Sequence, residues 1–289
     1  MSSDLGVKGA AFRRLHAGPG AFLIPNPWDA GSARVLAALG YKALATSSGA
    51  SAACLGKRDG EITREECLSH VRAIAAATDL PVAGDLENGF GDTPESTAET
   101  IRRAAEAGLV GGSIEDATGR PERPLYDFGQ AVERIAAAAE AARSLPFHFT
   151  LTARSEGFIR GRPDLDETIR RLSAFAQAGA DVVFAPGLPD LAAVHAVCAA
   201  VTKPVNFMVG IRGKSFSVRE LESARVRRIS FATSFYRSAL AGLISAACEA
   251  RDRGTFGYLE TAVTTPDLNA FLRPPANGAV RAPPPDGRQ

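Results

Sequence analysis

The stretch VAGDLENGFG, Val82–Gly91, joins a short apolar run to two carboxylates and then to glycines. The next apolar run, GGSIED, ends the same way at Glu115 and Asp116. Carboxylates that directly follow buried strands oppose burial unless something compensates their charge. In an α/β barrel the carboxyl ends of the strands form the active-site face. Clustered carboxylates with no Cys or His beside them favour a hard cation such as Mg²⁺ or Mn²⁺.

The same pattern recurs along the chain, as an Ala-rich amphipathic segment, a glycine or proline, and a short apolar run. Each repeat is typical of a helix that ends and leads into a buried strand. The predicted strands are Phe22–Pro25, Ala43–Thr46, Val82–Asp85, Gly112–Glu115, Phe147–Ala153, Val182–Ala185, Val205–Met208 and Arg228–Phe231. Continuous apolar strands that alternate with helices indicate a parallel sheet covered on both faces. We therefore predict an α/β fold, a (β/α)8 TIM-type barrel, with an open doubly wound sheet as the alternative.

The two ends of the chain differ from its body. Residues 1–255 are expected to form the barrel, with a short leading helix at Asp4–His16 and a long helix near Ser234–Arg253. Residues 256–272 are too apolar for a solvated tail, so we expect them to pack on the barrel or on a neighbouring subunit. Residues 273–289 are rich in Pro and Gly and are expected to be disordered.

Composition excludes several classes of protein. The formal net charge is +1 over 289 residues, which gives no support for binding nucleic acid or anionic membranes. No window approaches the roughly 20 apolar residues of a membrane helix, and the amino terminus lacks the apolar core of a signal peptide. The four scattered cysteines fit reduced thiols, and with these features we expect a cytoplasmic protein.

Polar residues follow the predicted strands where their carboxyl ends should meet. Ser47, Ser48 and Gly49 follow strand two and could offer backbone N–H groups to a carboxylate. Arg154 ends strand five and could clamp an anionic group with two parallel hydrogen bonds, or could simply neutralise the acidic cluster. A divalent ion on the carboxylates could chelate a 2-oxo acid and stabilise an enolate. Asp116 and Glu156 fit a structural role, as helix caps or in ion pairs, as well as they fit a role in the site.

The segment Ala50–Ile62 after strand two holds glycines and charges, among them Asp59. This composition predicts either a mobile lid over the barrel mouth or a solvated connection. The four histidines fall in predicted helices or at a strand start, so a zinc site is not expected.

Together these residues make the chain resemble the isocitrate lyase/phosphoenolpyruvate mutase superfamily. The resemblance spans about residues 22–234 and is carried by PNPWDAGSARVLAALGYKAL, SSGASAACLGKRDGE, VAGDLENGFG, SIEDATG and LTARSE. It implies a (β/α)8 barrel that forms homodimers or homotetramers by exchanging C-terminal helices. It also implies Mg²⁺ at Asp85, with Glu87 and Glu115 binding directly or through water.

The resemblance further implies 2-oxo acid binding at Ser47, Ser48 and Gly49, an anion contact from Arg154 and a gating loop that carries Asp59. Arg154 and Asp59 are the expected catalytic residues. Glu87 stands where the superfamily usually has Asp. Isocitrate and methylisocitrate lyases carry a Lys-Lys/Arg-Cys-Gly-His loop after strand four, whereas this chain reads ATGRPERPLYDF. The phosphonate enzymes use an Asn-Ser pair there and a His after strand six, where this chain has Ala185-Pro186-Gly187.

The function predicted from these observations is Mg²⁺-dependent cleavage of a C–C bond in a small 2-oxo or 2-hydroxy carboxylate, through a metal-stabilised enolate. The substrate would resemble oxaloacetate or methylisocitrate. The alternatives are a hydrolase or mutase of an acyl- or phosphono-pyruvate, and a non-catalytic binder of 2-oxo acids.

Overall fold

The computed structural model describes residues 2–273, and its centre is one sheet of eight parallel strands. The strands are β1 Phe22–Ile24, β2 Leu44–Ala45, β3 Val82–Asp85, β4 Gly111–Glu115, β7 Thr150–Arg154, β8 Val182–Phe184, β9 Val205–Met208 and β10 Arg228–Ser230. They neighbour one another in sequence order, with β10 pairing back to β1. All eight predicted strands are therefore present, and the (β/α)8 barrel is confirmed.

The barrel closes between β1 and β2, where pairing is thinnest because β2 has only two residues. The Ala45 N–H donates to the Pro25 carbonyl at 3.0 Å. The buried Asn26 side chain reinforces this seam: its amide donates to the Thr46 carbonyl and its oxygen accepts from the Phe231 N–H, both at 2.8 Å. One side chain thus ties together the carboxyl ends of three strands at the barrel mouth.

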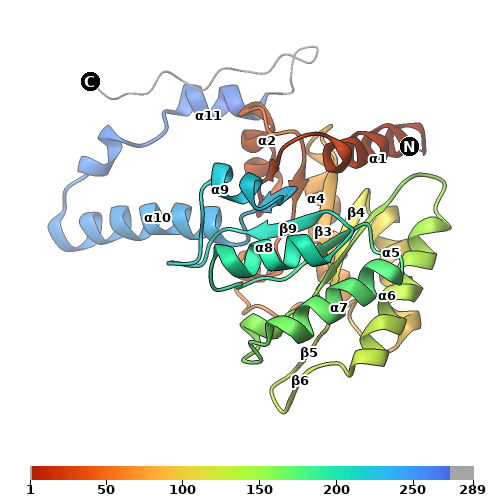
Figure 1. The fold of residues 1–289 in the computed structure, drawn as a ribbon. Helices are drawn as coiled ribbons and strands as arrows, with labels where there is room; N and C mark the ends of the chain where they lie inside the picture. Colours follow the sequence, from red (N-terminus) through yellow and green to blue (C-terminus); the bar gives the residue numbers. More distant parts are fainter. Residues whose placement is uncertain (1, 274–289) are drawn as a thin grey trace.

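Helices wrap the outside of the barrel (Figure 1). They are α2 Ala30–Ala38, α4 Arg64–Ala76, α5 Pro94–Glu106, α6 Phe128–Arg143, α7 Leu165–Gln177, α8 Leu191–Ala200 and α9 Val218–Ser223. Side-chain caps fix where most of these begin; in α4, for example, Thr63 and Glu66 form a capping box. The leading helix α1, Ser2–Ala17, buries Phe12 against Ala43 and Val110, which lie just before β2 and β4. It therefore covers the amino-terminal end of the barrel.

Three local predictions are wrong. The sequence ATGRPERPLYDF, read as a loop, contains an antiparallel hairpin of β5 Ala117–Arg120 and β6 Arg123–Leu125. The predicted lid loop from Ala50 onward begins as helix α3, Ser48–Cys54, because the Ser47 hydroxyl caps it. The strand predicted to begin at Phe147 begins at Thr150 as β7, so His148 precedes it. A short 3₁₀ turn, η1 Gly157–Ile159, follows β7.

The C-terminal arm, residues 234–272, leaves the barrel. It comprises α10 Ser234–Arg253, the 3₁₀ turn η2 Gly257–Glu260 and α11 Thr265–Leu272. None of these three elements has a buried residue, and Figure 1 shows α10 projecting away before α11 returns beside α2. The Arg34 guanidinium donates to the Leu272 carbonyl at 3.0 Å. Of the predicted tail, residues 274–289 lie outside the described residues.

No helix within residues 2–273 combines the length and the apolar character needed to cross a bilayer.

Candidate active site

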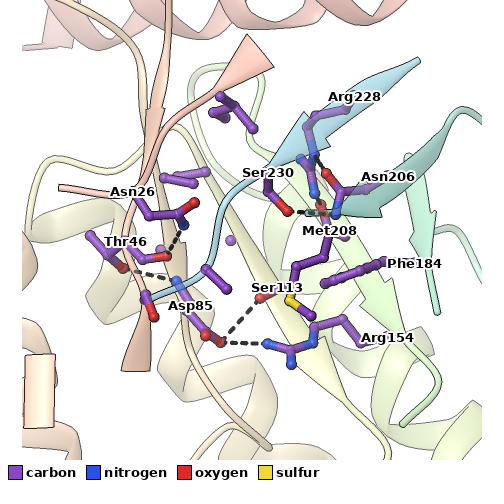
Figure 2. A pocket seen from close by; sticks show the side chains of 18 residues that line it. Asn26, Thr46, Asp85, Ser113, Arg154, Phe184, Asn206, Met208, Arg228 and Ser230 are labelled. Atoms are coloured by element: carbon purple, nitrogen blue, oxygen red, sulfur yellow. Dashed lines mark hydrogen bonds and ion pairs between the residues drawn. The ribbon is translucent and has the colours of Figure 1, made fainter. Parts of the chain in front are cut away.

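A cavity of about 80 Å³ opens at the carboxyl ends of the strands and reaches into the barrel (Figure 2). Its lining includes Ser47, Asp85, Ser113 and Arg154 from the ends of four strands. Three of these are predicted site residues, so the structure brings strands that are distant in sequence to one mouth, as parallel barrel topology requires.

Asp85 accepts more hydrogen bonds than any other carboxylate at the barrel mouth within residues 2–273. Its Oδ1 accepts from Arg154 Nη1 at 2.8 Å and from the Ser113 hydroxyl at 3.4 Å, as Figure 2 shows. Its Oδ2 accepts from the Ser48 N–H at 3.2 Å. These contacts fix the carboxylate on the inner face of β3, between the first turn of α3 and the end of β7.

Glu87 is held in a conformation that is rare for its residue type. Its φ is +48°, in the left-handed region, which costs free energy in a residue other than glycine. Its Oε1 is buried without a hydrogen-bond partner among the described residues. Burial, followed by the negative charges of Asp85 and Asp59, raises the pKa of Glu87 to about 7. A strained backbone therefore presents a carboxyl group whose buried oxygen lacks a partner.

Arg154 ends β7 and is surrounded by carboxylates. It donates to Glu156 Oε1 from Nε at 3.0 Å and from Nη2 at 2.8 Å, and its Nη2 lies 3.3 Å from Glu115 Oε2. Glu115 also accepts from Arg160 Nη2 at 3.2 Å. Burial, with the neighbouring Glu156, raises the pKa of Glu115 well above its usual range.

The charges of this cluster do not balance. Four carboxylates, those of Asp85, Glu87, Glu115 and Glu156, face two guanidiniums, those of Arg154 and Arg160. When fully ionised, the cluster has two negative charges in excess, which equals the charge of one divalent cation. The donors are all hard oxygens, the ligand type that Mg²⁺ and Mn²⁺ prefer.

The oxygen donors therefore fit such an ion chemically. Their side chains are not, however, arranged around a common centre in this structure. Within residues 2–273, no group of three His, Cys, Asp or Glu side chains has the spacing of a preformed metal site. Arg154 contacts two of the three predicted ligands, Asp85 and Glu115, so an ion would share these carboxylates with the guanidinium.

The predicted substrate-binding residues form the first turn of α3. Ser47 is buried and caps this helix, and Ser48 and Gly49 follow as its first two residues. Gly49 is closely covered: a Cβ there would lie 3.1 Å from Thr233 Cγ2 and 3.3 Å from Asp59 Cγ. The loop that carries Asp59 thus folds back onto the barrel mouth. The negative charge of Asp59 contributes to the raised pKa of Glu87.

Comparison with known proteins agrees with this architecture. Residues 12–251 match the family model described as phosphoenolpyruvate phosphomutase. This chain belongs to that family. It is also similar to 2-methylisocitrate lyase of Escherichia coli, with 30% identity over 241 residues and 80% of each chain covered.

Two further proteins are similar to this chain. An oxaloacetate decarboxylase of Bradyrhizobium diazoefficiens is 32% identical over 200 residues, which cover 67% of this chain and 68% of the relative. A solved structure from Burkholderia cenocepacia J2315, provisionally described as a lyase/mutase, is 51% identical with a TM-score of 0.92. The match covers 94% of this chain and 98% of that one.

Asp116 and Arg171 form a buried ion pair that supports the turn after β7. Asp116 accepts from the Glu156 N–H at 2.8 Å and pairs with Arg171 at 3.1 Å. Burial raises the pKa of Asp116 to about 6, although these bonds oppose the shift. Asp116 therefore holds the turn that positions Glu156, which is the ion-pair alternative considered from the sequence.

The sequence-based prediction missed the polar residues on the inner faces of the strands. Ser113 precedes Glu115 by two residues and Thr152 precedes Arg154 by two, and both line the cavity. Asn206, Arg228 and Ser230 line it as well. Because strand side chains alternate between two faces, two polar residues that are two positions apart in an apolar strand point to the same face. This spacing was the sequence signal that could have predicted a polar barrel interior.

Proposed function

We propose that this family member is a Mg²⁺- or Mn²⁺-dependent lyase that cleaves a C–C bond in a small 2-oxo or 2-hydroxy carboxylate. The observation that carries this proposal is the mouth cluster of Asp85, Glu87, Glu115 and Glu156, a set of hard oxygen donors beside a small cavity. When fully ionised, these carboxylates exceed the facing guanidiniums by two negative charges, which one divalent cation would compensate. Similarity to a methylisocitrate lyase and to an oxaloacetate decarboxylase supports the same reaction class.

In this proposal Asp85, Glu87 and Glu115 would hold the ion. A bound divalent cation would supply positive charge for the enolate that forms as the C–C bond breaks. Ser47, Ser48 and Gly49 would orient the substrate carboxylate with N–H groups of the first turn of α3. Arg154 would bind and orient a substrate oxygen. A cation bound to Asp85 and Glu115 would weaken the pairing of these carboxylates with Arg154, which would leave N–H groups of the guanidinium for the substrate.

Among the possible cleavages, decarboxylation of an oxaloacetate-like acid needs the fewest protein groups. The electrons of the breaking bond move toward the 2-oxo carbonyl as CO₂ leaves, so no base is required, and a proton is added afterwards. A retro-aldol cleavage would need a base for the substrate hydroxyl. The hairpin β5–β6 follows β4, where the resemblance places the acid–base loop of the lyases, and it carries no Cys, Lys or His. Asp59, on the loop that folds over α3, would exclude water from the mouth.

The deciding experiment is turnover of a panel of 2-oxo and 2-hydroxy acids with Mg²⁺, with Mn²⁺ and with EDTA. Asp85→Asn should lower turnover of the best substrate by at least about a hundredfold, because it removes charge at the site of transition-state stabilisation. The exposed Asp79→Asn should behave like the wild type. Turnover that survives both EDTA and Asp85→Asn would contradict the metal role, and binding without turnover would support the non-catalytic alternative.

A further inference from the structure

The barrel interior contains a guanidinium that has no carboxylate partner within residues 2–273. Arg228 begins β10 and is only 6% exposed. It donates from Nε to Asn206 Oδ1 at 2.8 Å and from Nη2 to Thr152 Oγ1 at 2.9 Å, and its Nη1 lies 3.5 Å from His16 Nε2. A guanidinium has five N–H donors, so these three contacts do not use its full capacity.

All three acceptors of Arg228 are uncharged. His16 donates from Nδ1 to the Phe12 carbonyl at 2.9 Å, which leaves the lone pair on Nε2. Burial, and then the charge of Arg228, lowers the pKa of His16 to about 3, so the imidazole is neutral. No acidic side chain among the described residues forms an ion pair with Arg228.

The other buried arginines are satisfied differently. Arg171 pairs with Asp116 and Glu167. Arg134 donates to three backbone carbonyls of residues 88–93, which follow β3. Arg228 has neither a carboxylate nor a backbone carbonyl among its hydrogen bonds, and a buried charge without a counter-charge is costly. Burial and the nearby Arg154 lower the pKa of Arg228 to about 9, at which it remains protonated near neutral pH.

Arg228 is not isolated from the active-site cavity. The same cavity is lined by Asp85 and Arg154 at the mouth and by Asn206 and Arg228 inside the barrel, as Figure 2 shows. Its volume is about 80 Å³. A group that enters from the mouth and reaches Arg228 must therefore be small, polar and negatively charged.

We propose that Arg228, oriented by Asn206 and Thr152, forms an anion subsite inside the barrel that binds the second carboxylate of a short dicarboxylic substrate. This inference rests on the proposed function for the identity of the ligand. The dicarboxylate spans the cavity, with one carboxylate at the mouth and the other on the guanidinium. The substrate carboxylate thus supplies the negative counter-charge that the fold does not provide for Arg228.

The test measures binding, so it does not depend on turnover. Calorimetric titrations in chloride-free buffer with Mg²⁺ compare malonate, a three-carbon dicarboxylate, with pyruvate, a monocarboxylate. Arg228→Met should weaken malonate binding about ten- to hundredfold, as expected for lost hydrogen bonds to a charged group. Pyruvate binding should change less than threefold, and the exposed Arg219→Met should change neither ligand.

A second variant keeps the inference testable if Arg228→Met does not fold. Asn206→Asp is nearly isosteric and places a permanent carboxylate 2.8 Å from Arg228 Nε. It should raise the melting temperature, because the buried charge gains a partner, and should weaken malonate binding at least tenfold while sparing pyruvate. A purely structural Arg228 would give the higher melting temperature with the preference for malonate over pyruvate unchanged.

The outcomes separate this inference from the proposed function. Equal loss of malonate and pyruvate, or no loss of either, in Arg228→Met or Asn206→Asp would overturn the subsite. Selective loss of malonate binding would support the anion subsite even if the protein turned over no acid. Absence of turnover would count only against the proposed lyase function. Chloride titration that weakens malonate binding in the wild type but not in Arg228→Met would locate the competing anion at the same guanidinium.

Discussion

At the scale of single residues, the site is defined by charges that are paired unevenly. Arg154 forms ion pairs with three carboxylates. In the part of the chain that the structure describes, Glu87 has a buried oxygen without a hydrogen-bond partner and Arg228 donates only to neutral acceptors. Such imbalances are unfavourable for folding and are typical of binding sites, because the missing partner arrives with the ligand.

Arg154→Met tests how much the Arg154 guanidinium stabilises the carboxylates at the barrel mouth. The change leaves four carboxylates facing one arginine, so the free energy of unfolding should fall by about 3–5 kcal/mol. Saturating Mg²⁺ should restore more stability in the variant than it adds to the wild type, because the ion relieves a larger repulsion. Urea denaturation with and without Mg²⁺ measures both effects.

Arg170→Met is the matched control, since Arg170 forms an exposed ion pair with Glu167 at 2.7 Å. It should cost less than about 1 kcal/mol and should not alter the response to Mg²⁺. If Mg²⁺ stabilises Arg154→Met and the wild type equally, the ion does not sit on this cluster.

His16 predicts a specific sensitivity to acid. Its pKa is about 3 in the folded protein and 6.5 when unfolded, so the unfolded chain binds the additional proton between these values. Stability is therefore lost as pH falls through this window, by roughly 2–3 kcal/mol between pH 7 and pH 4.5. His16→Gln removes the titration, and its urea midpoint should fall less than that of the wild type over this range. Parallel loss in both proteins would show that His16 is not responsible.

At the scale of elements, the first turn of α3 and the loop that follows it fit together closely. Gly49 lies in the helix, where alanine is intrinsically favoured by about 1 kcal/mol. Its missing Cβ, however, makes room for Asp59 and Thr233. The loop between α3 and α4 therefore depends on this glycine for its position over the mouth.

Gly49→Ala should leave global stability unchanged or slightly raised but displace the Asp59 loop. Trypsin should then cleave faster at Lys57 or Arg58, which lie in that loop, and affinity for 2-oxo acids should fall. Gly6→Ala in α1, where no atom lies within 4 Å of the new Cβ, controls for helix propensity alone. Equal trypsin rates in all three proteins would contradict this role for Gly49.

At the scale of the whole molecule, the C-terminal arm is the part that the single chain does not bury. Leu243, Phe256 and Leu259 are 63%, 59% and 61% exposed. Burying one such side chain contributes about 1.5–3 kcal/mol, so an arm that projects from the barrel favours packing on another copy of the chain. We propose a homodimer or homotetramer held together by exchange of these helices.

Deletion of residues from Phe256 onward should yield monomers or insoluble protein, because the exposed apolar side chains of Phe256, Leu259 and Val263 would no longer be there to cover a second copy of the chain. Light scattering after size-exclusion chromatography measures the mass. Truncation after Arg273, which retains the whole arm, should leave the oligomer intact. An unchanged oligomer in the shorter variant would refute helix exchange.

The sequence by itself determined the barrel and most of its mouth. Eight apolar runs at regular spacing predict eight parallel strands, and parallel strands place their carboxyl ends at one face. Asp85, Arg154 and Ser47, which line the cavity, and Glu115, which pairs with Arg154, therefore had to converge wherever the sheet closed. Each of these inferences depends only on short-range periodicity and on topology.

Tertiary structure alone decided which charges are paired. The contact of Arg154 with Asp85 joins residues 69 positions apart, and that of Arg228 with Thr152 joins residues 76 apart. Such pairings depend on side-chain rotamers and on the stagger between strands, which no local pattern encodes. The hairpin β5–β6 was missed for a related reason: its strands are short and polar, so their pairing comes from the surrounding fold rather than from hydrophobic alternation.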